Sequence, residues 1–285
     1  MKDKQQIIQY NGMSETGEGD VSRKGLPIIV GGCHRSGTSL VRFMLDAHSR
    51  IYCGPEVKFF LDFYSDYLND PVQPARFMTS ARRMLPKQQL FKVLGRSFVV
   101  LHERAAARAG KPRWADKNPE NVLYLEDWQR LLSENWVLVH VVRNPLDTLA
   151  SLKEAKFNPL VIPSELGARI DLYKRYTQAG LDFGKLHPER YYRVVYERLV
   201  DRPKSVTSSL MDWLEESFET EQLDFNSVHH QKGLEDRKVR KTTRVHAESV
   251  GRWKKLLMPS EVEQIYRECG PLWQRIVDDP DYGSH

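Results

Sequence analysis

The sequence predicts a single α/β domain in which a parallel β-sheet, beginning with a P-loop-like turn, is flanked by helices. Two observations carry this prediction. A short apolar segment, residues 27–31, leads into a glycine-rich turn that is followed by apolar residues at helical spacing. Farther along, apolar segments alternate with helical ones, an order typical of parallel sheets with right-handed crossovers. No repeat or linker follows residue 26, so we expect residues 26–285 to form one domain.

In the first half of the chain, residues 27–31 predict a buried strand that ends in glycine. Apolar residues then recur every three to four positions from Leu40 to Ala47, which predicts a helix. Residues 62–109 have a mostly helical pattern with breaks at prolines. A further helix is expected to start at Asn118-Pro119 and to run to about Leu132, because proline is well tolerated at the first helical position.

The second half contains the clearest strand of the sequence, residues 136–142. It is nearly all apolar, as expected for a central parallel strand that is buried on both faces. Another strand is expected at residues 191–196. One helix is expected to start at Asn144-Pro145, and two others at residues 165–183 and 203–218. A last helix is expected to begin at a capping box formed by Ser260 and Glu263 and to end at Val277. Residues 231–255 are rich in Lys and Arg and predict a loop.

Composition and charge favour an anionic ligand. The 285 residues include 43 Lys and Arg against 38 Asp and Glu, which gives a net charge of +5 and an isoelectric point near 9.0. This balance suits a phosphorylated or sulfated ligand, with nucleic acid as the competing explanation.

Cysteine usage and the N-terminus indicate the compartment. The chain has an odd number of cysteines and no C-x-x-C pair, which argues against a disulfide framework and for a reducing compartment. No stretch approaches the ~20 apolar residues of a membrane span. Residues 1–25 are polar and lack the apolar segment of a signal peptide. We therefore expect a flexible N-terminal tail at residues 1–25, a cytoplasmic protein and no membrane partner.

The glycine-rich turn, "GGCHRSGTS", is suited to an anion but not in the manner of an ATPase. Gly32 and Gly37 have the spacing of G-x-x-x-x-G-K-[ST], and Ser39 is in place, but Thr38 stands where the lysine should be. The nearest cation is Arg35, whose guanidinium can donate two hydrogen bonds to an oxyanion. A turn feeding a helix also directs backbone N–H groups at one point. The alternative is a turn without a ligand.

A family resemblance follows from the longer runs "RSGTSLVRFMLDAH" and "CGPE". They resemble the phosphosulfate-binding region of sulfotransferases that use 3′-phosphoadenosine-5′-phosphosulfate (PAPS), and are most similar to the tyrosylprotein branch. The resemblance implies a sulfotransferase fold and sulfuryl transfer that releases adenosine 3′,5′-bisphosphate (PAP). The phosphosulfate would bind Arg35, Ser36, Gly37, Thr38 and Ser39. His34 is a departure, because the branch usually has proline there.

The run "VVRNPLDTLAS" resembles the family's 3′-phosphate site, an arginine followed eight positions later by a serine. It implies that Arg143 and Ser151 bind that phosphate; the alternative is that Arg143 pairs with Asp147. Tyr196 belongs to a "YE-x-L" run like the family's and would pack near the nucleotide or in the core. Residues 251–253, Gly-Arg-Trp, could be the segment with which the family covers the 3′-phosphate.

Sulfuryl transfer needs a base for the acceptor's proton and cations where negative charge develops. The resemblance implies that Glu56 is the base and that Lys117 stabilises the leaving oxygen, with Arg35 beside the sulfate. The alternative for each of the first two is a solvent-exposed charge. His102 or His140 could be the base instead, and Lys58 could orient the substrate. We expect no metal requirement, because a sulfuryl group carries less charge than a phosphoryl group.

The acceptor is left open between a hydroxyl and an amine. The tyrosylprotein enzymes carry a cysteine that could bridge to the Cys-Gly cysteine, whereas this chain has Ala115 there, so Cys53 has no such partner. A small-molecule acceptor is therefore preferred to a protein tyrosine. A P-loop kinase or NTPase is the second hypothesis, and a non-catalytic anionic-nucleotide-binding protein is the third. We expect no nucleic-acid partner, and a homodimer stays an open alternative.

Overall fold

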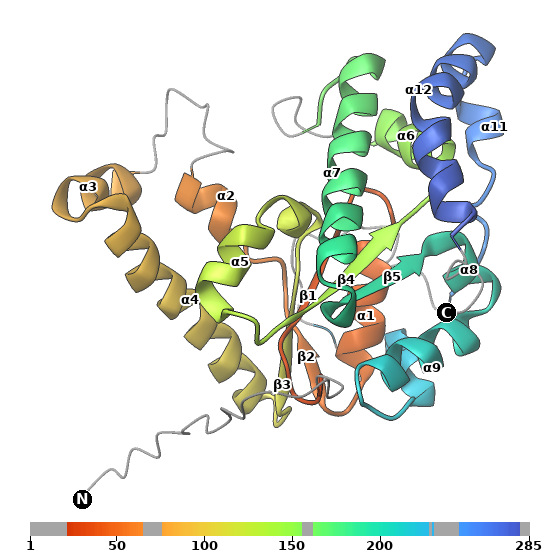
Figure 1. Ribbon diagram of the computed structural model, residues 1–285. Helices are drawn as coiled ribbons and strands as arrows, with labels where there is room; N and C mark the ends of the chain where they lie inside the picture. The colour runs from red at the N-terminus through yellow and green to blue at the C-terminus, as the bar shows by residue number, and fades with distance from the viewer. Residues whose placement is uncertain (1–21, 65–75, 156–161, 228–229, 231–244, 280–285) are drawn as a thin grey trace, which may run out of the picture.

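The structure, a computed structural model, describes residues 22–64, 76–155, 162–227, 230 and 245–279. It confirms the predicted α/β class with a parallel sheet flanked by helices (Figure 1). The described strands are β1 (Ile28–Gly32), β2 (Ile51–Cys53), β3 (Arg113–Lys117), β4 (Val137–Val142) and β5 (Tyr191–Val195). The described α-helices are α1 (Thr38–Ala47), α2 (Phe59–Tyr64), α3 (Arg76–Met84), α4 (Lys87–Arg108), α5 (Leu125–Leu132), α6 (Pro145–Glu154), α7 (Leu166–Leu186), α8 (Tyr196–Asp201), α9 (Pro203–Trp213), α11 (Trp253–Leu256) and α12 (Pro259–Val277).

The sheet has the order β2-β3-β1-β4-β5, and every described strand pair is parallel. Strand β1 lies in the centre, with β3 on one side and β4 on the other. All residues of β1 and β4 are buried, which explains why these two strands are apolar except for His140.

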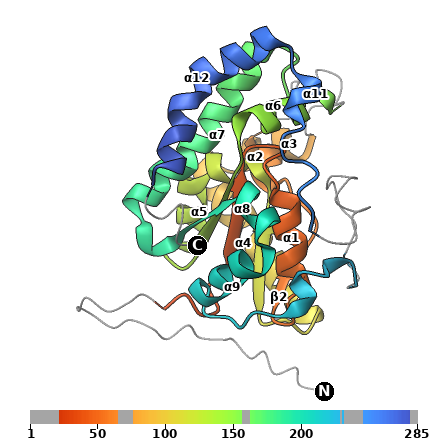
Figure 2. The same cartoon turned by 90° about the vertical axis from the view of Figure 1, so that its right-hand side faces the viewer.

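Alternate strand residues supply two cores, one on each face of the sheet. Ile28 and Val30 pack in one cluster with residues of α1, α8 and α9, whereas Ile29 packs in another with residues of α4 and α5. A third cluster joins α6, α7 and α12. Figures 1 and 2 show α12 lying along α7 at the end of the molecule where α6 and α11 are found.

The structure differs from the sequence-based prediction at several elements. Strands β2 and β3 were not predicted, because β2 has only three residues and β3 is half charged. Pro119 begins a short 3-10 helix, Pro119–Leu123, and the α-helix α5 starts only at Leu125. Strand β5 ends at Val195, so Tyr196 is the first residue of α8.

Two predicted helix ends are also wrong. Helix α9 ends at Trp213 and not near residue 218, because Glu215 adopts a positive φ of 58°. Helix α12 starts at Pro259, one residue before the predicted Ser260 capping residue. There the Glu261 carboxylate accepts the backbone N–H of Met258 at 2.7 Å, so the capping interaction lies two residues earlier than expected.

The expected tail, residues 1–25, falls mostly outside the described residues. Its last residues contact the domain: Ser22 Oγ and the Arg23 backbone N–H both donate to the Glu215 carboxylate. Arg113 in β3 donates to the Arg23 and Leu26 carbonyls. Residues 22–25 are therefore held against the domain by hydrogen bonds.

Candidate active site

The carboxyl ends of the five described strands meet at one edge of the sheet, and the candidate residues stand there. Strand β1 ends in the glycine-rich loop, β2 leads to Glu56 and β3 ends at Lys117. Beyond β1, strand β4 is followed by Arg143 and β5 by Tyr196. Because open α/β sheets bind ligands at this edge, the fold gathers residues that are far apart in the sequence.

The loop between β1 and α1 has a left-handed backbone at two positions. Arg35 has φ 69° and Gly37 has φ 104°, and the N–H of Ser36 donates to the Cys33 carbonyl at 3.1 Å. Gly37 is the N-cap residue of α1 and supplies no side-chain cap. The first N–H groups of α1 therefore face the loop without a capping side chain, and can bind an anion.

Tyr196 packs directly on this loop. A Cβ atom added at Gly37 would lie 2.4 Å from Cδ2 of the Tyr196 ring, so only glycine fits there. Tyr196 also belongs to the buried core cluster of that face of the sheet. Both interpretations of this tyrosine, in the core and near the loop, are thus compatible with its position.

Arg143 and Ser151 lie on the α6 side of the loop, and Arg35 reaches them. Arg143 donates from Nη1 to the Arg35 carbonyl at 3.0 Å and from Nη2 to the Ser249 carbonyl at 2.6 Å. Its guanidinium lies 4.3 Å from the centre of the Tyr196 ring. The Nε of Arg35 donates to Ser151 Oγ at 2.9 Å. Arg35, which we expected beside the sulfate, thus contacts the candidate 3′-phosphate serine.

On the β3 side of the loop, Lys117 and Glu56 form a buried ion pair. Their side chains are 0% and 8% exposed, so neither is the solvent-exposed charge of the alternative interpretation. Lys117 Nζ also donates to Ser39 Oγ at 3.1 Å, which ties the pair to the loop. Burial opposes the negative charge of Glu56, but Lys117 and Lys58 outweigh burial and lower the pKa of this carboxyl below its ordinary value.

The ion pair continues toward His34 through two further charges. Lys58 lies 2.8 Å from Glu56 and 3.0 Å from Glu120, and Glu120 lies 3.2 Å from His34 Nε2. Burial would raise the pKa of Glu120, but His34 and Lys58 lower it well below its ordinary value. The sequence prediction did not include Glu120, although it follows Lys117 by only three residues. His34 therefore has an acidic partner where the resembling branch has proline.

The segment that carries Glu56 is fixed by two polar residues of α1. Arg42 is fully buried and donates from Nε to the carbonyls of Cys53 and Gly54, at 3.2 and 2.6 Å. Asp46 Oδ1 accepts the backbone N–H of Cys53 at 3.0 Å. Both were missed in the sequence, where the signal is an arginine and an aspartate four residues apart in an otherwise apolar helix.

The two alternative bases lie elsewhere. His102 is 3.3 Å from Asp116, which neighbours Lys117 in β3 and therefore points to the opposite face of the sheet. His140 is fully buried in β4, and its Nδ1 lies 2.9 Å from the Tyr191 hydroxyl. Burial and the charge of Arg193 lower the pKa of His140 to about 3. The positions of both histidines are explained by packing.

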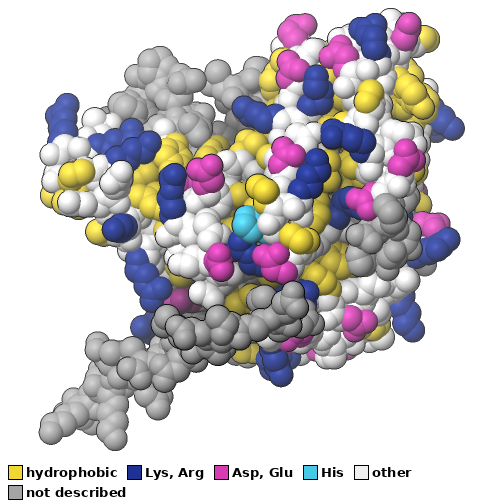
Figure 3. Space-filling model, in the orientation of Figure 1, with side chains coloured by type: hydrophobic (Ala, Val, Ile, Leu, Met, Phe, Trp, Pro, Cys, Tyr) yellow, Lys and Arg dark blue, Asp and Glu magenta, His cyan; other side chains and the backbone are white. Residues whose placement is uncertain are grey.

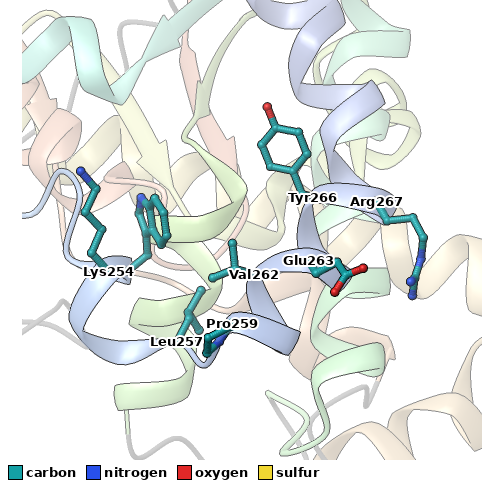
Figure 4. A pocket seen from close by; sticks show the side chains of 8 residues that line it. Lys254, Leu257, Pro259, Val262, Glu263, Tyr266 and Arg267 are labelled. Carbon is teal, nitrogen blue, oxygen red and sulfur yellow. The ribbon is translucent and has the colours of Figure 1, made fainter.

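The C-terminal segment lies against α6. Asp147 accepts the backbone N–H groups of Gly251 and Trp253, and Arg252 pairs with Glu154. Asp147 thus uses both carboxylate oxygens on this segment, in place of the alternative pairing with Arg143. An open hollow of about 810 Å³ lies beside α11 and α12, and its lining includes Trp253, Leu257, Val262 and Tyr266 (Figure 4).

The described residues contain no group of three His, Cys, Asp or Glu side chains arranged to hold a metal ion. None of the helices that the structure describes is sufficiently long and apolar to cross a membrane. On the face shown in Figure 3, the described Lys and Arg side chains alternate with Asp and Glu instead of forming one basic surface.

Comparison with known proteins agrees with this geometry. A model of the sulfotransferase family matches residues 27–220, which include β1 to β5 and every candidate residue of the loop and of β2 to β5. The chain belongs to the sulfotransferase family. The predicted membership of the chain in that family is thereby confirmed.

Two curated proteins are similar to this sulfotransferase. An uncharacterized protein of Aquifex aeolicus is 26% identical over 254 residues, covering 84% of this chain and 31% of that protein. The chain thus spans less than a third of that relative's length. A candidate protein-tyrosine sulfotransferase of Caenorhabditis briggsae is 25% identical over 215 residues, covering 72% of this chain and 69% of that protein.

Solved structures share the fold. The sulfotransferase domain of the Synechococcus PCC 7002 olefin synthase superposes with a TM-score of 0.61 at 18% identity, covering 89% of this chain and 98% of that one. The sulfotransferase domain from the curacin biosynthetic pathway gives a TM-score of 0.54 at 19% identity, covering 87% and 98%. A sulfotransferase from Alicyclobacillus acidocaldarius gives 0.51 at 15% identity, covering 90% and 95%.

Proposed function

We propose that this sulfotransferase transfers a sulfuryl group from PAPS to a hydroxyl or amine of an acceptor and releases PAP. One observation carries the proposal. Ser36 Oγ in the loop and Arg143 Nε beside it are buried, and neither has a hydrogen-bond partner among the described residues. Buried polar groups without a partner are rare and each costs about 1–3 kcal/mol. An anionic ligand at the loop would supply both partners.

The nucleotide would lie across the loop. The phosphosulfate would bind the backbone and side chains of Arg35, Ser36, Gly37, Thr38 and Ser39. The 3′-phosphate would bind Arg143 and Ser151, while the Tyr196 ring packs against the guanidinium of Arg143. Arg35 donates a hydrogen bond to Ser151, so we assign this arginine to the junction between the phosphosulfate site and the 3′-phosphate site. No metal ion is part of the proposed site.

PAPS supplies an activated sulfuryl group on a phosphate oxygen. The acceptor oxygen or nitrogen forms a bond to sulfur while the bond from sulfur to that phosphate oxygen breaks, and PAP leaves with the electron pair. Glu56 takes the acceptor's proton, and Lys117 donates to the departing oxygen, where negative charge develops.

The contact between Lys117 and Glu56 couples the two roles. In the structure, Lys117 contributes to the lowered pKa of Glu56. A lysine that turns toward the phosphosulfate leaves Glu56 with less compensating charge in a buried site. The pKa of Glu56 then rises and the carboxylate becomes a stronger base when the donor is bound.

We propose a small-molecule acceptor. The strand register places Ala115 directly beside Cys53, and Cys53 is a free, buried cysteine. The disulfide that the resemblance to the tyrosylprotein branch implies thus has no second cysteine at this position. The name of the Caenorhabditis relative supports the other candidate, a protein tyrosine, so both acceptor classes belong in the assay.

Calorimetric titration with PAP, AMP and ATP tests the nucleotide assignment. Charged hydrogen bonds to the 3′-phosphate are worth on the order of 2–3 kcal/mol, so PAP should bind roughly 30-fold to 150-fold more tightly than AMP. Equal affinity for PAP and AMP contradicts the proposal, and a preference for ATP supports the kinase hypothesis. Mass spectrometry of mixtures with PAPS and either small phenols and amines or tyrosine peptides then identifies the acceptor class.

A further inference from the structure

Asp147 occupies the middle of the Arg143–Ser151 run, but it faces away from the loop and toward the C-terminal segment. Asp147 is buried, with only 3% of its surface exposed. Oδ2 accepts the Gly251 N–H at 2.8 Å and Oδ1 accepts the Trp253 N–H at 3.1 Å. Both carboxylate oxygens are thus used to hold the backbone of a segment about a hundred residues away in sequence.

The local geometry of that segment makes the two N–H groups available. Gly251 has φ 76°, a conformation that turns the chain and that glycine adopts without strain. Trp253 is the first residue of α11, so its N–H has no partner within the helix. A buried carboxylate is a strong acceptor for both, because hydrogen bonds to an ionised group exceed those between neutral groups.

The segment held in this way contacts the guanidinium of Arg143. The Ser249 carbonyl, two residues before Gly251, accepts from Nη2 of Arg143 at 2.6 Å. The loop carbonyl of Arg35 accepts a hydrogen bond from Nη1 of Arg143, and the ring of Tyr196 lies against the guanidinium. Three contacts therefore orient the Arg143 guanidinium, and the contact with the Ser249 carbonyl is the one that depends on the C-terminal segment.

The side-chain ion pairs between this segment and α6 in the described residues are partly exposed. Arg252 pairs with Glu154, and both side chains are about one-third exposed (35% and 34%). Lys153 donates to the Leu256 carbonyl and to the Glu261 carboxylate, also near the surface. Because solvent-exposed ion pairs contribute little to stability, Asp147 is the buried polar connection between residues 249–253 and α6, beside the packing of Trp253 against the cluster that includes Leu149.

We propose that Asp147 is a positioning residue for the 3′-phosphate: by holding residues 249–253, it keeps the Ser249 carbonyl on Arg143 and orients that guanidinium toward the nucleotide. The inference rests on the proposed use of PAPS. Asp147 itself touches neither nucleotide nor acceptor. Its effect should therefore be confined to ligands that carry a 3′-phosphate.

The test is the ratio of PAP to AMP affinity in Asp147→Asn, measured by calorimetry. Asparagine keeps the shape and one acceptor oxygen, but it turns an N–H₂ group toward a backbone N–H. We expect PAP affinity to fall by roughly tenfold, the equivalent of one charge-assisted hydrogen bond. AMP affinity should stay within about twofold, because AMP does not use Arg143. In turnover assays, KM for PAPS should rise while kcat at saturation is largely retained.

Three further variants make the result specific. Gly251→Ala disturbs the same segment through the positive φ of its turn without changing α6, so it should reproduce the selective loss of PAP affinity. Asp127→Asn removes the charge of another buried aspartate, one that accepts from the Tyr64 hydroxyl, and should leave the ratio unchanged. Glu154→Gln removes only the exposed pair and should also leave it unchanged.

The outcomes separate the two levels of inference. If wild type does not prefer PAP to AMP, the proposed function is overturned. If wild type prefers PAP and both Asp147→Asn and Gly251→Ala retain that preference, the function stands and the positioning role is wrong. An equal loss of PAP and AMP affinity in folded Asp147→Asn, with thermal unfolding as the check, assigns Asp147 to general structure and also contradicts the proposal.

Discussion

Four charges of alternating sign form a row in which each lies within hydrogen-bonding distance of the next, in a site that is nearly closed to water: Lys117, Glu56, Lys58 and Glu120. Desolvating such groups costs several kcal/mol per ion, and apolar residues would often be more stable. Each charge here is paired, so the arrangement is tolerated, but removing one member leaves its partner buried without compensation. This arrangement suits proton and sulfuryl transfer better than it suits stability.

Glu56→Gln tests the base. Glutamine keeps the size of the side chain and can still accept from Lys117, but it cannot take a proton at neutral pH. We expect turnover to fall by roughly 10²–10⁴, while PAP affinity changes by no more than about threefold because Glu56 does not touch the nucleotide. Sulfated product is followed by mass spectrometry and PAP binding by calorimetry.

Glu120→Gln is the matched control for this variant. Glu120 shares Lys58 with Glu56, whereas the ion pair of Lys117 is made with Glu56. It should therefore retain most of its turnover after correction for stability. Near-normal turnover in Glu56→Gln would show that the proton leaves by another route.

The loop and the start of α1 act together with α8, because the Tyr196 ring lies where a side chain at position 37 would be. This packing keeps the loop close to the sheet. It also explains why glycine is needed at that position both for its φ and for space.

Gly37→Ala should weaken nucleotide binding. The added Cβ conflicts with Tyr196, and the φ of 104° is unfavourable for alanine, a strain on the order of 1–3 kcal/mol. We expect PAP affinity to fall roughly tenfold or more, with a lower Tm. Gly110→Ala is the control: Gly110 has φ 71° but nothing within 4 Å of the added Cβ. If the two variants bind PAP equally well, the contact of the loop with Tyr196 does not matter for the nucleotide.

Across the whole protein, the lowered pKa values of Glu56 and Glu120 link stability to pH. Burial opposes their charge, but neighbouring cations outweigh it, so the unfolded chain takes up protons at a higher pH than the folded protein does. Stability is therefore fully present above about pH 5 and is lost as the pH falls through the acidic range. We expect Tm to decline between about pH 5 and pH 3, and the decline to be shallower in Glu120→Gln. Identical pH profiles would contradict this linkage.

The protein's own cations should make the reaction independent of added metal ions. Arg35, Lys117, Arg143 and the N–H groups of α1 all lie at the loop, and a sulfuryl group needs less charge compensation than a phosphoryl group. Product formation in the presence of EDTA should equal that without it. Loss of activity with EDTA and its recovery with Mg²⁺ would instead support the kinase hypothesis.

Much of this site was predictable because its signals are short. The loop residues and the Arg143–Ser151 run are contiguous patterns, and the buried strands β1 and β4 are apolar except for His140. Glu56 and Lys117 were named from resemblance alone. Their mutual contact was not predicted, since it joins residues that are 61 positions apart.

Local sequence was sufficient for the α/β class, the glycine-rich loop between β1 and α1, and the central strands, because hydrophobic periodicity and turn chemistry act over a few residues. Packing between distant segments determined strand β3 and the contacts among the candidate residues. Strand β3 forms despite its two charged residues, Asp116 and Lys117. Asp116 accepts hydrogen bonds from Asn118 and Asn121. Lys117 donates to Glu56 and Ser39. The contact of Arg35 with Ser151 and the hydrogen bonds of the buried Asp147 to Gly251 and Trp253 likewise join segments that are far apart in the sequence.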